Sequence, residues 1–70
     1  MIGKPELDAR LDDLRNALAR LTRDQREVIV LRFQAGLPTR EVAAVLGKKE
    51  ATVYSLQVRA VAALRRRLSA

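Results

Sequence analysis

The segment from Thr39 to Arg67 most constrains the fold, because helical patterning in it is interrupted only once and only briefly. The segment reads TREVAAVLG, then Lys48 and Lys49, then EATVYSLQVRAVAALRRR. Apolar residues fall at positions 42, 45 and 46, and again at 53, 56, 60 and 64, a spacing that puts them on one face of each helix. Two amphipathic helices joined by so short a break predict a helix-turn-helix.

A helix over about residues 5–20 is predicted at the start of the chain, where Pro5 suits a first turn. Leucines repeat along it at alternating steps of four and three: Leu7, Leu11, Leu14, Leu18 and Leu21. This seam is shorter than the roughly three to four heptads that a coiled coil usually needs. We therefore expect it to pack against the rest of the chain.

A second helix, over about residues 23–35, is predicted by its end signals. Thr22 and Gln25 have the spacing of a capping box, Gly36 is placed to end the helix in the left-handed conformation, and Pro38 prevents continuation. Leu37 can then fold back on the last turn. The expected inner side consists of Val28, Leu31, Arg32 and Ala35, widened by Ile29 and Phe33.

The third and fourth helices are predicted over about residues 39–46 and 50–68. Thr39 is the expected N-cap of the third helix and Gly47 its end, which leaves about three residues for the turn. No linker, repeat or low-complexity segment is evident. Residues 1–70 are therefore predicted to form a single all-α domain of four helices containing a helix-turn-helix.

The formal net charge of +6 is concentrated in the second half of the chain. Residues 1–30 balance six basic against six acidic side chains, whereas residues 31–70 oppose only Glu41 and Glu50 to eight basic side chains. The eight are Arg32, Arg40, Lys48, Lys49, Arg59, Arg65, Arg66 and Arg67. A local positive field of this kind suits a polyanion, although a basic solvated helix face would show the same pattern.

Enzymatic and metal chemistry find little support in the composition. The chain has no cysteine and no histidine, so thiolate or imidazole ligands and the most common catalytic base are absent. Asp8 and Asp12 lie one turn apart, but on an arginine-rich helix we interpret them as solvent-facing acids. The apolar runs are far shorter than the roughly 18 residues of a bilayer span. We expect a cytoplasmic binding module with no catalytic residue, metal, cofactor or membrane contact.

DNA contacts are expected from the side of the fourth helix that faces away from Val53, Leu56, Ala60 and Leu64. In helix-turn-helix docking, early residues of the second helix enter the major groove and flanking cations hold phosphates. The candidates for base reading are Ala51, Ser55 and Val58, and those for phosphate contact are Arg40, Lys48, Lys49, Tyr54 and Arg59. Tyr54 fits packing as well as DNA contact, and the run at 65–67 fits the negative end of the helix dipole better than a DNA contact.

The order and spacing of several blocks resemble a known family. QREVIVLRF at 25–33, the pair Gly36-Leu37, EVAAVLG at 41–47 and RAVAALRR at 59–66 are similar to the C-terminal promoter-recognition domain of bacterial sigma factors, most closely the extracytoplasmic-function group. The resemblance covers about residues 7–68.

This resemblance implies a fold, partners and site residues. Such domains bind the −35 element of promoter DNA through the second helix of the motif, contact the flap of the RNA polymerase beta subunit, and are often masked by an anti-sigma factor or other protein regulator. Glu50, Ala51, Ser55 and Arg59 match the groove-facing positions of the family. This chain departs from the pattern at Tyr54, where a basic residue is common, and at Lys49, where a small hydroxyl residue usually caps the helix.

Two alternatives remain open on the sequence. The effector domain of a response-regulator-type activator shares the LTxxQREV and helix-turn-helix layout, although the leucine-rich first helix and the RAVAALRRRL ending favour the sigma family. A domain bound mainly by a protein regulator, through an apolar groove between helices, is the other. The DNA-contacting face offers few strong base readers, which motivates this second alternative.

Overall fold

The structure, a computed structural model, describes residues 5–68, and the side chains from Ala9 onward. The expectations for the Leu7 and Asp8 side chains therefore lie outside the described residues. Within this range the chain forms α1 (Pro5–Ala19), α2 (Arg23–Ile29), the π-helix η1 (Val30–Gln34), α3 (Thr39–Leu46) and α4 (Glu50–Leu68), and no strand. The all-α prediction is confirmed, with helix ends close to those expected.

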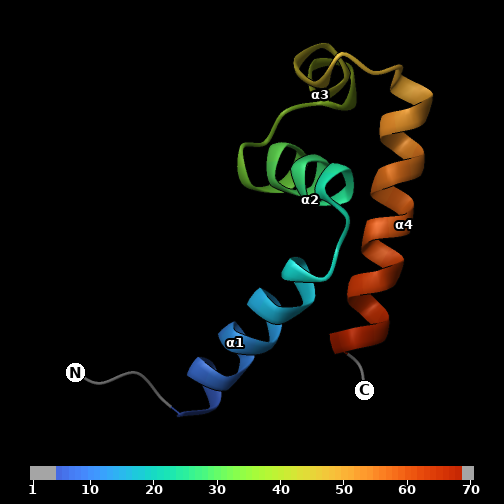
Figure 1. The fold of residues 1–70 in the computed structure, drawn as a ribbon. Helices are drawn as coiled ribbons and strands as arrows, with labels where there is room; N and C mark the ends of the chain where they lie inside the picture. The colour runs from blue at the N-terminus through green and yellow to red at the C-terminus, as the bar shows by residue number, and fades with distance from the viewer. Residues whose placement is uncertain (1–4, 69–70) are drawn as a thin grey trace.

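The long helix α4 is the element on which the others pack (Figure 1). α3 and α2 lie beside its N-terminal half, and α1 approaches its C-terminal half. The main core forms between α2, α3 and α4, where Val28, Val42 and Val53 are completely buried. Each buried valine contributes about 1.5–3 kcal/mol relative to an exposed one. α4 is thereby held by its inner face, so its outer face stays available.

The leucine seam of α1 packs less than its regularity predicts. Its last turn is buried at Ala17, and Leu21, which follows the helix, is buried too. Leu11 and Leu14 are exposed, which contradicts the expectation that the whole seam packs on the chain. The reason is visible in Figure 1, where α1 diverges from the other helices toward its N-terminus.

The second predicted helix is not one α-helix over residues 23–35. It changes at Val30 into η1, and the Ala35 amide donates to the Val30 carbonyl at 2.9 Å, five residues back. A π-turn holds more than 3.6 residues, so side chains beyond Val30 rotate away from the positions that an α-helical wheel assigns. Phe33, expected on the inner stripe, is consequently 57% exposed, and Ala35 is exposed as well.

Most of the predicted helix ends are confirmed. The Gln25 amide donates to the Thr22 hydroxyl (3.1 Å) and the Thr22 amide to Gln25 Oε1 (3.3 Å), which completes the capping box. Gly36 has a φ of 73°, and the Leu37 amide folds back to donate to Leu31. These contacts fix where α2 begins and where the chain turns toward α3.

The start of α3 differs from the prediction by one residue. Pro38, in extended conformation, occupies the N-cap position that we assigned to Thr39, and its carbonyl accepts the amides of Glu41 and Val42. The inner face of α3 is also shifted: Ala43 is buried, whereas Val45, expected inside, is 62% exposed. Val42, Ala43 and the half-buried Leu46 form the side of α3 that packs on the core, and spacing alone does not specify which side that is.

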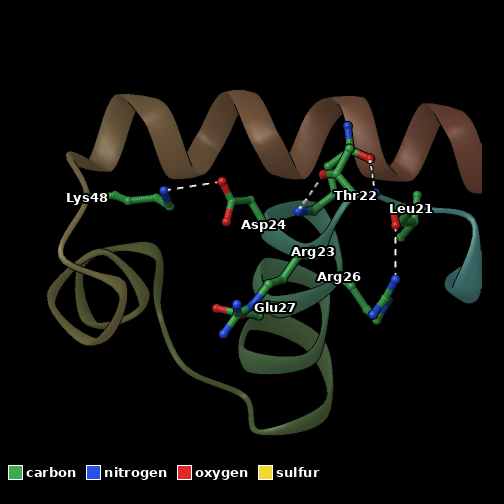
Figure 2. A network of polar contacts seen from close by, with 8 residues as sticks. Leu21, Thr22, Arg23, Asp24, Arg26, Glu27 and Lys48 are labelled. Atoms are coloured by element: carbon green, nitrogen blue, oxygen red, sulfur yellow. Dashed lines mark hydrogen bonds and ion pairs between the residues drawn. The ribbon is translucent and has the colours of Figure 1, made fainter.

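An arginine that the sequence analysis did not single out joins α1 to α2. Arg26 donates from Nε to the Leu18 carbonyl and from Nη2 to those of Ala19 and Leu21, at 3.1–3.3 Å. Figure 2 shows its side chain reaching Leu21. Leu18 and Ala19 lie in the last turn of α1 and Leu21 just beyond it, where carbonyls lack the regular donors of a continuing helix, so Arg26 closes that helix.

Candidate nucleic-acid interface

The turn between α3 and α4 is short because Gly47 ends α3 abruptly. Gly47 has a φ of 65°, a left-handed conformation that is costly for residues with a Cβ, and both its amide and that of Lys48 donate to the Ala43 carbonyl. The Lys49 carbonyl already accepts the Val53 amide at 3.0 Å, so α4 starts at once. The geometry is that of a helix-turn-helix.

The inner face of α4 is the predicted one. Val53 and Ala60 are fully buried, and Leu56 and Leu64 are half-buried. Because these four residues hold α4 by one side, residues on the opposite side of the helix point outward. The outward set at the start of α4 is exposed throughout: Lys49, Glu50, Ala51, Tyr54, Ser55, Val58 and Arg59.

These seven positions include all three expected base readers. Ala51, Ser55 and Val58 lie at steps of four and three, so they line one side of the helix. Arg40, the expected phosphate contact from α3, is exposed in the first turn of that helix. The structure therefore brings most of the sequence-predicted positions onto one accessible helix face, with one more cation on α3.

Lys48 is the exception among the nine predicted positions. Its Nζ lies 3.4 Å from Asp24 Oδ2, and its side chain is only 28% exposed. Figure 2 shows the two side chains pointing toward one another beside the first turns of α4. Lys48 is thus engaged with a carboxylate of α2 rather than standing open as we expected, because packing of α2 against α4 brings Asp24 to the turn.

The outer face of α4 also carries apolar residues beyond those predicted. Val61 and Ala62 line a shallow hollow of about 260 Å³ together with Tyr54, Val58 and the polar residues Gln57 and Arg65. The signal was present in the sequence, since positions 54, 58, 61 and 65 repeat at helical spacing on a side of α4 that flanks the inner face. The exposed side of α4 therefore carries apolar residues in its middle and cations at its start and its end.

The start of α4 has no side chain suited to cap it. Lys49 occupies the N-cap position, and an ammonium group offers no acceptor for the free amides of the first turn. Glu50 partly compensates, because a carboxylate in the first turn is favourable near the positive end of the helix dipole. Position 49 thus provides a cation on the candidate interface where a capping residue would stabilise the fold.

Replacing Lys49 with serine tests whether position 49 sacrifices helix stability for a cation on the candidate interface. Lys49→Ser is expected to raise the free energy of unfolding by about 0.5–2 kcal/mol, the usual value of an N-cap hydroxyl. The same change is expected to weaken binding to duplex DNA, because a cation is removed from the candidate interface. Urea unfolding and fluorescence anisotropy measure the two effects, and Lys49→Ala, which removes the charge without adding a cap, is the control. Equal stability of the serine and alanine variants would contradict the capping argument.

No helix within residues 5–68 is both long enough and apolar enough to cross a membrane. The part of the surface that the structure describes also carries exposed large apolar side chains. Two of them, Val30 and Val45, border a groove of about 340 Å³ on α2, η1 and α3. Its other lining residues are Leu31, Leu46, Arg26 and Glu27. The expected apolar groove between helices thus exists, and its lining includes no residue of α4.

Comparison with known proteins gives the same family as the sequence blocks. The model of the family described as "Sigma-70, region 4" matches residues 11–64. Over 55 residues the chain is 46% identical to the ECF RNA polymerase sigma factor BldN of Streptomyces coelicolor, an alignment that covers 79% of this chain and 21% of that protein. The chain therefore spans about a fifth of the length of this relative. Because the family match takes in the turn motif and well over half of the sequence, the chain belongs to the sigma-70 region 4 family.

Proposed function

We propose that this chain recognises the −35 element of promoter DNA and acts in transcription initiation together with RNA polymerase. The observation that carries the proposal is the exposed, cationic start of α4, which follows directly on the turn after α3. Insertion of a helix into a major groove requires that one face packs on the domain and that the opposite face is exposed. In this proposal the chain binds promoter DNA in the cytoplasm and positions RNA polymerase on it, and it catalyses no reaction itself.

Phosphate contacts supply most of the affinity in this proposal. Three exposed cations could contact the phosphates of the two DNA strands: Arg40 on α3, Lys49 at the start of α4 and Arg59 on α4. Ala51 and Val58 offer only apolar surface, which suits a thymine methyl group, and Ser55 donates or accepts without strong preference. Sequence preference therefore rests in part on DNA shape and on the assembly that places the domain.

A second surface supports a protein partner. The groove bordered by Val30, Leu31, Val45 and Leu46 is almost wholly apolar and lies on α2, η1 and α3. A partner helix seated there would leave the outer face of α4 free for DNA. We assign this groove to the flap of the RNA polymerase beta subunit, with an anti-sigma factor or other protein regulator as its competitor.

Selection from a pool of short duplexes with randomised central positions tests promoter recognition. The full chain is immobilised, bound duplexes are amplified over successive rounds, and the pools are sequenced. The proposal predicts enrichment of one short motif. For the enriched pool, the logarithm of the binding constant is expected to fall linearly with the logarithm of the salt concentration. Pools that stay random while binding remains salt-dependent would contradict sequence recognition, and absence of binding at low salt would contradict DNA contact altogether.

A further inference from the structure

We propose that Asp24 lowers the DNA affinity of this domain, because its carboxylate competes with a DNA phosphate for the ammonium group of Lys48. The inference rests on the proposed function, because it concerns the same helix-turn-helix surface. Asp24 lies in the first turn of α2, and Lys48 in the turn between α3 and α4. The pair therefore joins two elements that are distant in sequence at the edge of the DNA-facing surface.

The backbone of Lys48 is fixed, so the reach of its side chain decides its partner. The Lys48 amide is bound to the Ala43 carbonyl at 3.0 Å, next to the left-handed Gly47. From this position the ammonium reaches Asp24 Oδ2 at 3.4 Å, and the two side chains point toward one another (Figure 2). The other cations among the expected phosphate contacts, Arg40, Lys49 and Arg59, form no ion pair with any side chain that the structure describes.

A carboxylate in this place opposes DNA binding whichever way the pair responds. If Lys48 stays on Asp24, the pair has no net charge and Lys48 releases no counterion from DNA. If Lys48 moves to a phosphate, it must leave Asp24, which is 54% exposed and then presents its negative charge near the DNA backbone. Because Asp24 is half-exposed, water can solvate its carboxylate when Lys48 leaves. Removing the charge of Asp24 also leaves no buried group unsatisfied.

The first-turn position of Asp24 gives it a structural role that the test must separate. An acid in the first turn of α2 is favourable to the helix dipole, so its removal costs some stability. The capping box of Thr22 and Gln25 does not involve the Asp24 side chain and remains in an Asp24 variant. The helix start therefore survives the substitution.

The test is a salt titration of DNA binding by the full chain, with a fluorescent short duplex of random sequence as the probe. Asp24→Asn is expected to bind about three- to tenfold more tightly at low salt and to steepen the log K against log salt slope by about 0.9, the value for one further phosphate contact. Asp12→Asn, which makes the same charge change at an exposed position of α1, is the matched control and is expected to change the slope little. Circular dichroism checks that each variant is folded, and Asp24→Ser serves as a second variant.

The double variant decides whether Asp24 acts through Lys48. In a Lys48→Gln background, the gain from Asp24→Asn is expected to fall to the level of the Asp12→Asn control. An equal gain in both backgrounds would overturn the proposal, and so would unchanged or weaker binding by Asp24→Asn. Salt-dependent binding of the unaltered chain separates these failures from that of the proposed function, because a chain that binds no DNA at all overturns both.

Discussion

Replacement of Val53 with aspartate is expected to unfold the domain. Val53 is completely buried where α2, α3 and α4 meet, beside Val28 and Val42. Aspartate there would place a carboxylate without a partner in the core and remove apolar contacts, at a cost of more than about 4 kcal/mol. A domain of this size has roughly 5 kcal/mol of stability to lose. Circular dichroism is expected to show loss of the helical signal and of the cooperative thermal transition.

Val58→Asp is the matched control for this prediction, since it makes the same substitution on the outer face of the same helix. Val58 is 49% exposed, so the variant is expected to stay folded with a thermal transition near that of the unaltered chain. DNA binding is expected to fall nonetheless, because a carboxylate then lies on the candidate interface. Unfolding by Val58→Asp, or a folded Val53→Asp, would contradict the assignment of the two faces of α4.

Removal of two cations from the α4 surface is expected to abolish most DNA binding while leaving the fold intact. Lys49 and Arg59 are exposed, so Lys49→Gln with Arg59→Gln is expected to keep the helical signal. The loss of two phosphate contacts makes the salt slope shallower by about 1.8 and weakens binding at low salt by about 100-fold. Fluorescence anisotropy over a series of salt concentrations measures both effects.

A control with the same net charge separates local contacts from the overall field. Arg10→Gln with Arg15→Gln removes two exposed cations from α1, which packs toward the other end of α4. This variant is expected to lose only a small part of the affinity, because exposed charges beyond the Debye length of about 8–10 Å are largely screened. If both double variants weaken binding equally, the start of α4 is not the site of contact.

The parts of the fold that local signals encode were predictable from the sequence. The capping box at Thr22, the left-handed ends at Gly36 and Gly47, and the inner face of α4 from Val53 to Ala60 all follow from spacings of a few residues. These signals depend on the backbone geometry of one helix and its ends, which the order of residue types specifies directly. They were sufficient to place the turn and the exposed start of α4.

The features that were missed depend on how the helices pack. Phe33 is exposed because η1 widens the helical turn, and Val45 is exposed because α3 turns Ala43 rather than Val45 toward the core. Neither feature has a sequence signal of its own. Asp24 and Lys48 are 24 positions apart, so only the packed structure shows their pairing. The same is true of Arg26, whose guanidinium closes the end of α1. Side-chain partners at the candidate interface were therefore the least predictable part of the site.

In the proposed function, DNA meets the outer face of α4 from its first turn onward. Titration of a ¹⁵N-labelled full chain with a short duplex, followed by amide chemical shifts, tests it most directly. We expect the largest shifts at residues 48–59 and at Arg40, and small shifts along α1 and in the groove of Val30 and Val45. Shifts concentrated in that groove or along α1, with residues 48–59 unchanged, would contradict it.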